Sequence, residues 1–175
     1  MNKQIKKFLP TLIGLSLVLA SFSSPAANAS VRSKTTKPIS TAYAFKGKTL
    51  AGVSFSGKEL AGKPAVIWFW APWCSICRGE APDLVALANT FKGKVRIIGV
   101  PGLASVNDMK QFVKDTRTSN IVHVADSDGA IWQHFQIPAQ PAFIFVTSKG
   151  TISRQIGALS KSDLFAITKQ LLKKA

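Results

Sequence analysis

A run of six apolar residues, Ala65–Trp70, leads almost directly into Cys74 and Cys77. A run without alternating polar residues is typical of a central strand that is covered on both faces. Such a strand needs helices packed on both sides of its sheet. The sequence therefore places the two cysteines after a central strand of an α/β fold, at the start of the helix that follows.

The rest of the chain alternates between strand-like and helix-like segments. We expect helices at 75–91, 105–116 and 130–135 and from Ser160 onward, and further strands at 95–100, 121–124, 142–147 and 151–156. Pro82 should break or bend the first helix near Arg78. The segment 148–150 predicts a hairpin, which makes the sheet mixed. The order predicts an α/β fold with a central mixed β-sheet flanked by helices on both faces.

The N-terminus has the pattern of a secretory signal. Three lysines within the first seven residues precede an apolar stretch at 8–22, and Ala27-Asn28-Ala29 matches a small-x-small cleavage site. A permanent membrane anchor is the alternative, but the stretch is short for a span of about 20 apolar residues. We predict a signal peptide at 1–29 cleaved after Ala29, a flexible leader at 30–40, one domain at 41–175, and a secreted or extracytoplasmic protein.

The chain is strongly basic, with a net charge of +15, which becomes +12 without the three lysines of the signal. Nucleic-acid binding would be one explanation of such a charge. The lysines are scattered, however, and no basic helix with interleaved aromatic residues is present. We predict a solvated basic surface with weak attraction to anionic lipid or wall polymers, no nucleic-acid partner, and a monomer.

The spacing of Cys74 and Cys77 indicates thiol–disulfide exchange. A thiolate at a helix start faces unpaired N–H groups and the positive end of the helix dipole, which lowers its pKa. Zinc is disfavoured because His123 and His134 lie eleven residues apart and form no second ligand pair. An inert structural bridge is disfavoured because so short a loop restricts the unfolded chain little. A copper(I)-binding thiol carrier is the alternative from another class.

A calcium loop at Asp126-Ser127-Asp128-Gly129 is also disfavoured. The twelfth position of that loop would need a glutamate, and Ile137 stands there. We expect the two aspartates to cap the short helix that follows, and we predict no metal site.

The segment from Phe69 to Pro82, with Trp73, Cys74-x-x-Cys77 and Glu80 between, resembles the active-site run of thioredoxin-fold proteins of the TlpA/DsbE-like extracytoplasmic branch. The segment 131–143 is similar to the second half of secreted DsbE-like proteins. The resemblance implies a thioredoxin-like fold over 41–175 and a thiol–disulfide oxidoreductase without a cofactor. It also implies that Cys74 attacks the substrate and Cys77 resolves the mixed disulfide.

The resemblance implies further site residues. Pro141 would follow a cis peptide bond, with Gln140 beside the attacking sulfur and free to pair with an extended substrate. Trp73 would form an apolar lip for the substrate, with simple packing as the alternative. Glu80 would exchange a proton with Cys77, or instead be a surface acid paired with Arg78 or a lysine. Trp68 occupies the place where cytosolic thioredoxins carry a buried aspartate.

The sequence indicates the direction of electron flow less directly than it indicates the type of reaction. Trp68 in place of an acid, Arg78 beside Cys77 and the basic surface all favour a thiolate, and so a stable reduced form. We therefore expect a secreted enzyme that oxidises thiols of exported proteins and is recycled by a membrane redox partner. The alternative is an extracytoplasmic disulfide reductase of the cytochrome c maturation type, which Glu80 favours.

Overall fold

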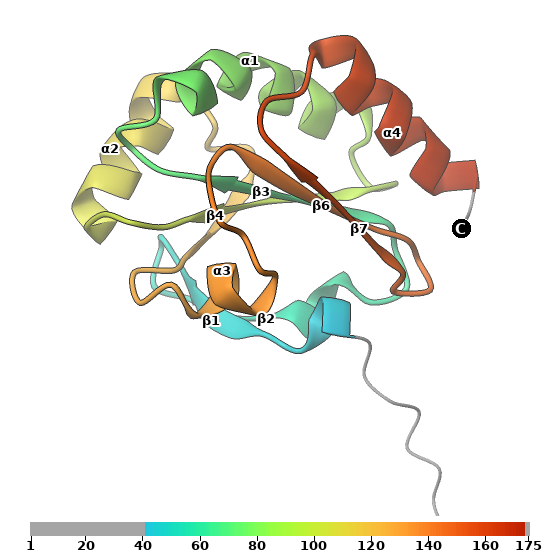
Figure 1. The fold of residues 1–175 in the computed structure, drawn as a ribbon, viewed down its shortest axis with the longest axis horizontal. Coiled ribbons are helices and arrows are strands. Elements are labelled where there is room, and N and C mark those ends of the chain that lie inside the picture. The colour runs from blue at the N-terminus through green and yellow to red at the C-terminus, as the bar shows by residue number, and fades with distance from the viewer. Residues whose placement is uncertain (1–40, 174–175) are drawn as a thin grey trace, which may run out of the picture. The chain divides into compact units, whose positions relative to one another are not determined.

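A mixed sheet of seven strands forms the centre of the protein in its computed structural model, which describes residues 41–173 (Figure 1). The elements are η1 (Thr41–Tyr43), β1 (Lys46–Thr49), β2 (Ser54–Ser56), η2 (Gly57–Leu60), β3 (Ala65–Trp70), α1 (Ser75–Thr90), β4 (Arg96–Pro101), α2 (Val106–Thr116), β5 (Val122–Ala125), α3 (Ala130–His134), β6 (Ala142–Val146), β7 (Ile152–Ile156) and α4 (Lys161–Lys173).

The apolar strand β3 lies inside the sheet, as its composition predicts. It pairs in parallel with β4 and antiparallel with β6, and the strand order is β2-β1-β5-β4-β3-β6-β7. Every residue of β3 is buried, which explains why the segment contains no polar residue. The parallel and antiparallel pairs together confirm the predicted mixed sheet.

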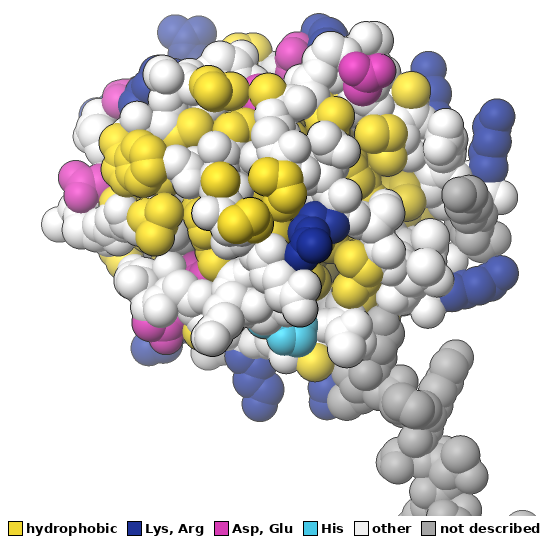
Figure 2. Space-filling model, in the orientation of Figure 1, with side chains coloured by type: hydrophobic (Ala, Val, Ile, Leu, Met, Phe, Trp, Pro, Cys, Tyr) yellow, Lys and Arg dark blue, Asp and Glu magenta, His cyan; other side chains and the backbone are white. Residues whose placement is uncertain are grey.

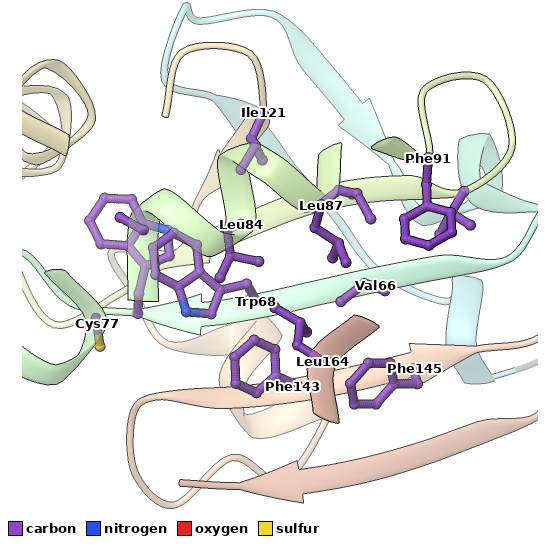
Figure 3. Packing of buried hydrophobic residues seen from close by; sticks show 14 of the residues in the cluster. Val66, Trp68, Cys77, Leu84, Leu87, Phe91, Ile121, Phe143, Phe145 and Leu164 are labelled. Carbon is purple, nitrogen blue, oxygen red and sulfur yellow. The ribbon is translucent and has the colours of Figure 1, made fainter. Parts of the chain in front are cut away.

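Two apolar cores cover the two faces of the sheet. On one face α1, α2 and α4 pack over alternate residues of β3 and β6; on the other face η1, η2 and α3 do so (Figure 1). Figure 3 shows Trp68 and Phe143 from the sheet facing Leu84 of α1, with Cys77 at the margin of the same cluster. The cysteine pair is thereby anchored to the larger core.

One expectation about local structure is wrong in part. Pro82 does not break α1, which is continuous from Ser75 to Thr90 with the proline inside it. A proline removes one backbone hydrogen bond, but Ala81, Leu84 and Leu87 bury the same helix in the core and outweigh that loss.

The predicted signal peptide and leader lie outside the described residues. Within residues 41–173, no helix combines the length and the apolar composition needed to cross a membrane.

Candidate active site

The two cysteines form a disulfide where β3 passes into α1. Cys74 is the N-cap of α1 and Cys77 lies in its first turn, with their Cα atoms 5.3 Å apart. The residue Cys74 is 6% exposed, whereas Cys77 is fully buried. Cys74 is therefore the more accessible of the two cysteines, and an incoming thiolate can reach its sulfur more readily.

Backbone groups around Cys74 favour a negative charge on its sulfur. The N–H of Cys77 donates to Cys74 Sγ at 3.0 Å. The N-terminal end of a helix adds a positive potential at the same place. After reduction, both effects stabilise a thiolate on Cys74 more than on Cys77, which lies inside the helix.

Gln140 and Pro141 lie at the same end of the sheet as the disulfide. Ala142, directly after them, pairs with Phe69 of β3, and the N–H of Gly157 donates to the carbonyl of Pro141 at 2.9 Å. The Gln140–Pro141 peptide bond is cis, which confirms that prediction. Roles of these two residues in substrate binding stay predictions.

Glu80 is a buried acid, so the alternative of a surface acid paired with Arg78 is wrong. It is 8% exposed, and its Oε1 accepts the N–H of Leu159 at 3.0 Å, while Oε2 has no partner. Burial raises the pKa of the Glu80 carboxyl to about 7, and the hydrogen bond from the Leu159 N–H opposes this rise. Arg78 pairs instead with Asp115 of α2, 3.6 Å away.

We expect Glu80→Gln to change how stability depends on pH. Because the folded-state pKa of Glu80 is raised, its contribution to stability is present below about pH 4.5 and is lost as pH rises through about 7. The free energy of unfolding of the variant, relative to wild type, should therefore increase by about 1–3 kcal/mol from pH 5 to pH 8. Urea unfolding of both oxidised proteins measures it.

The free energy of unfolding of the variant must be compared with that of wild type at each pH, because His123 makes stability depend on pH in the opposite direction. Burial lowers the pKa of His123 to about 4, so its contribution is present above about pH 6.5 and lost on acidification. Asp115→Asn, which removes an exposed carboxylate, is the matched control. A Glu80→Gln difference that does not change with pH would contradict the assignment.

Trp73 is 62% exposed. The alternative that this residue is simply packed in the core is therefore wrong. Its Nε1 donates to the carbonyl of Leu103 at 3.2 Å, and Leu103 lies in the loop between β4 and α2. This bond ties the segment before Cys74 to that loop.

The other polar candidates have structural partners. The carboxylate of Asp126 accepts the N–H groups of Ile131 and Trp132 and so caps α3, as expected. His123 is buried, with Trp70 Nε1 donating to its Nδ1 at 3.3 Å and its Nε2 3.1 Å from the carbonyl of Thr118. Within residues 41–173, no three His, Cys, Asp or Glu side chains are grouped as a metal ion would require.

One contact beside the disulfide was not predicted. The Arg78 guanidinium lies over the ring of Phe112, 4.9 Å from its centroid, and Phe112 stacks on Trp70 with ring centroids 4.1 Å apart. The cation that follows Cys77 is therefore held toward α2. The spacing of residues along α1 does not predict a contact with a residue of another helix such as α2.

Comparisons with known proteins place the chain in a family. A model of the AhpC/TSA family matches residues 39–155. The chain belongs to the AhpC/TSA family. Soluble secreted antigen MPT53 of Mycobacterium tuberculosis is 41% identical over 125 residues, which cover 69% of this chain and 70% of that protein.

Two solved structures extend the likeness of this AhpC/TSA-family protein. MTB DsbF aligns with a TM-score of 0.73 and 39% identity, over 75% of this chain and 97% of that one. A secreted Mycobacterium tuberculosis disulfide oxidoreductase homologous to Escherichia coli DsbE aligns with a TM-score of 0.68 and 36% identity, over 72% of this chain and 95% of that one. The thioredoxin-like fold, the DsbE-like resemblance and the class of thiol–disulfide oxidoreductase are confirmed. The roles of individual residues stay predictions.

Proposed function

We propose that this protein acts outside the cytoplasm and oxidises thiols of exported proteins through the Cys74–Cys77 pair. The names of its relatives, a secreted antigen and a secreted disulfide oxidoreductase, support the location. An extracytoplasmic site also suits the chemistry, because disulfides persist there. The enzyme works as a monomer without a cofactor, and a membrane redox partner reoxidises it.

The observation that carries the oxidising direction is the position of Cys74 as N-cap of α1, with its sulfur accepting the Cys77 N–H. A thiolate held in this way is stabilised, and only the reduced enzyme contains it. Stabilising the reduced form raises the reduction potential of the couple. A higher potential favours transfer of the enzyme's disulfide to substrate thiols.

The proposed exchange conserves bonds and electrons. A substrate thiolate attacks Cys74 Sγ, a mixed disulfide forms, and the Cys77 sulfur leaves with the electron pair of the broken bond. A second substrate thiolate then attacks the substrate sulfur and releases Cys74 as a thiolate. Glu80, with a pKa near neutrality, is suited to exchange the proton of Cys77 in the first step.

A transfer assay tests the direction. The oxidised enzyme, mixed under nitrogen with one equivalent of a reduced, unfolded protein containing one cysteine pair, should remove most of the substrate thiols. Enzyme that has been reduced and alkylated is the control and should remove none. If the thiols persist, and reduced enzyme instead opens the disulfide of the oxidised substrate, the oxidising function is wrong.

A reductase of the cytochrome c maturation type is the second candidate, favoured by the burial of Glu80 within α1, about one turn after Cys77. A full negative charge there opposes a thiolate and stabilises the disulfide. Because burial raises its pKa to about 7, however, Glu80 carries less negative charge at neutral pH than an acid of ordinary pKa does. For the copper(I) carrier, titration of the reduced protein with copper(I) is the test.

A further inference from the structure

Several loops meet at the end of the sheet that lies opposite the disulfide. β3 and β4 begin side by side at this end, with Ala65 paired to Arg96, and both strands run from there toward the end that carries the cysteines. The turn between β6 and β7 lies at the same end, because Val146, the last residue of β6, also pairs with Ala65. Segments that are distant in the chain therefore form one surface there.

Exposed cations are concentrated on this surface. We use the name basic end for the following residues: Lys58, Lys63, Lys92, Lys94, Arg96 and Lys149. The Nζ of Lys63 donates to the carbonyl of Gly93 at 3.1 Å, which ties the segment before β3 to the loop before β4. The last turns of α4 line a pocket together with the β6–β7 turn, and they add Lys169 and Lys173. Figure 2 shows Lys and Arg side chains, but no Asp or Glu, along its right-hand edge, where this end lies.

Almost no negative charge balances these cations. The chain has 8 Asp and Glu residues, and of these only Glu59 lies at the basic end. The two ion pairs found among residues 41–173, Arg78–Asp115 and Lys161–Asp83, lie elsewhere on the domain. The basic end therefore presents positive charge that the protein itself does not neutralise.

We propose that the basic end binds the surface of a bilayer that contains anionic lipids. All of its members except Arg96 are lysines, whose compact charge suits diffuse attraction to many headgroups better than bidentate recognition of one phosphate. A bilayer is extended enough to contact cations on all of these segments at once. No exposed large aromatic side chain lies among them, so a single-stranded nucleic acid would find no platform on which to stack its bases.

The start of the domain lies next to the basic end. Tyr43 Oη donates to the carbonyl of Thr147, directly after β6, at 3.4 Å. The predicted leader that precedes the domain contains Arg32, Lys34 and Lys37 and no acid, and so adds positive charge from the same side. The attraction of the domain to an anionic bilayer is therefore reinforced by the segment that leads into it.

This attachment would fix the orientation of the active site. β3 is about 20 Å long, so a bilayer at the basic end leaves the disulfide facing away from the membrane, open to exported proteins. A membrane redox partner would then need a domain that rises above the bilayer. The proposal goes beyond the proposed function and does not depend on the direction of electron flow, because the cations of the basic end lie far from the disulfide.

Sedimentation with vesicles tests the proposal. The protein is used without residues 1–29, which lie outside the domain and whose apolar segment would bind lipid by itself. It is mixed with vesicles of pure phosphatidylcholine, or with vesicles in which phosphatidylglycerol is about one third of the lipid. At about 0.1 M salt, binding to the anionic vesicles should be at least about tenfold stronger than to the neutral ones, and about 1 M salt should abolish it by screening.

Three substitutions at the basic end should remove most of the binding. A cation close to an anionic bilayer strengthens binding by roughly fivefold. Lys92→Gln, Lys94→Gln and Lys149→Gln combined should therefore weaken binding to the anionic vesicles by at least about tenfold. All three side chains are exposed, so the rate of exchange with dithiothreitol should stay unchanged.

A variant of equal net charge is the matched control. Lys46→Gln, Lys48→Gln and Lys110→Gln combined also remove three exposed cations, but none of them belongs to the basic end. At about 0.1 M salt the Debye length is only about 10 Å, so charges on other parts of the surface contribute little. This variant should bind anionic vesicles within about threefold of wild type.

Three outcomes would overturn the proposal. Equal losses in the two triple variants would mean that net charge alone drives the binding. Equal binding to neutral and anionic vesicles would mean that the headgroup charge is not recognised. Binding to soluble polyphosphate without binding to either kind of vesicle would make a polymer, not a bilayer, the partner of the basic end.

Discussion

Cys74→Ser should abolish disulfide exchange, with the rate falling to that of the reaction without protein. Cys74 is the accessible sulfur and the N-cap of α1, whereas Cys77 is fully buried inside the first turn. A serine hydroxyl neither forms disulfides nor ionises near neutral pH, so no partial activity is expected. The loss should appear with every substrate and in both directions of electron flow.

Cys77→Ser gives the contrasting result and is the matched control. It keeps the attacking thiolate but removes the thiol that resolves the mixed disulfide. Incubation with oxidised substrate protein should accumulate a covalent complex through Cys74, visible on a non-reducing gel and reversed by dithiothreitol. Complexes that accumulate in Cys74→Ser, through Cys77, would reverse the assignment of the two sulfurs.

Local patterns predict the central part of this site. The apolar run Ala65–Trp70 forms β3 with the expected bounds, because six consecutive apolar residues suit a strand that is buried on both faces. The cysteines follow at the helix start, and the cis bond before Pro141 is where the resemblance implies it. Each of these features depends on residues that are close together in the chain.

Features that depend on distant contacts could not be predicted in this way. Glu80 is buried because Trp68 and Leu159 enclose it, and Leu159 lies 79 residues further along the chain. Leu103 lies beside Trp73 across 30 residues of sequence, with the Trp73 indole donating to its carbonyl. The continuity of α1 through Pro82 likewise depends on packing against the sheet, which periodicity does not measure.

The reduction potential of the Cys74–Cys77 couple tests the central claim most directly. Stabilisation of the Cys74 thiolate by the Cys77 N–H and the helix terminus favours the reduced form, and Glu80 opposes it with less negative charge than an acid of ordinary pKa carries. Equilibration with glutathione should therefore give about −200 mV or higher, at least ~70 mV above thioredoxin, or roughly two hundredfold in the equilibrium constant. A value at or below about −270 mV would contradict the account and identify a reductase.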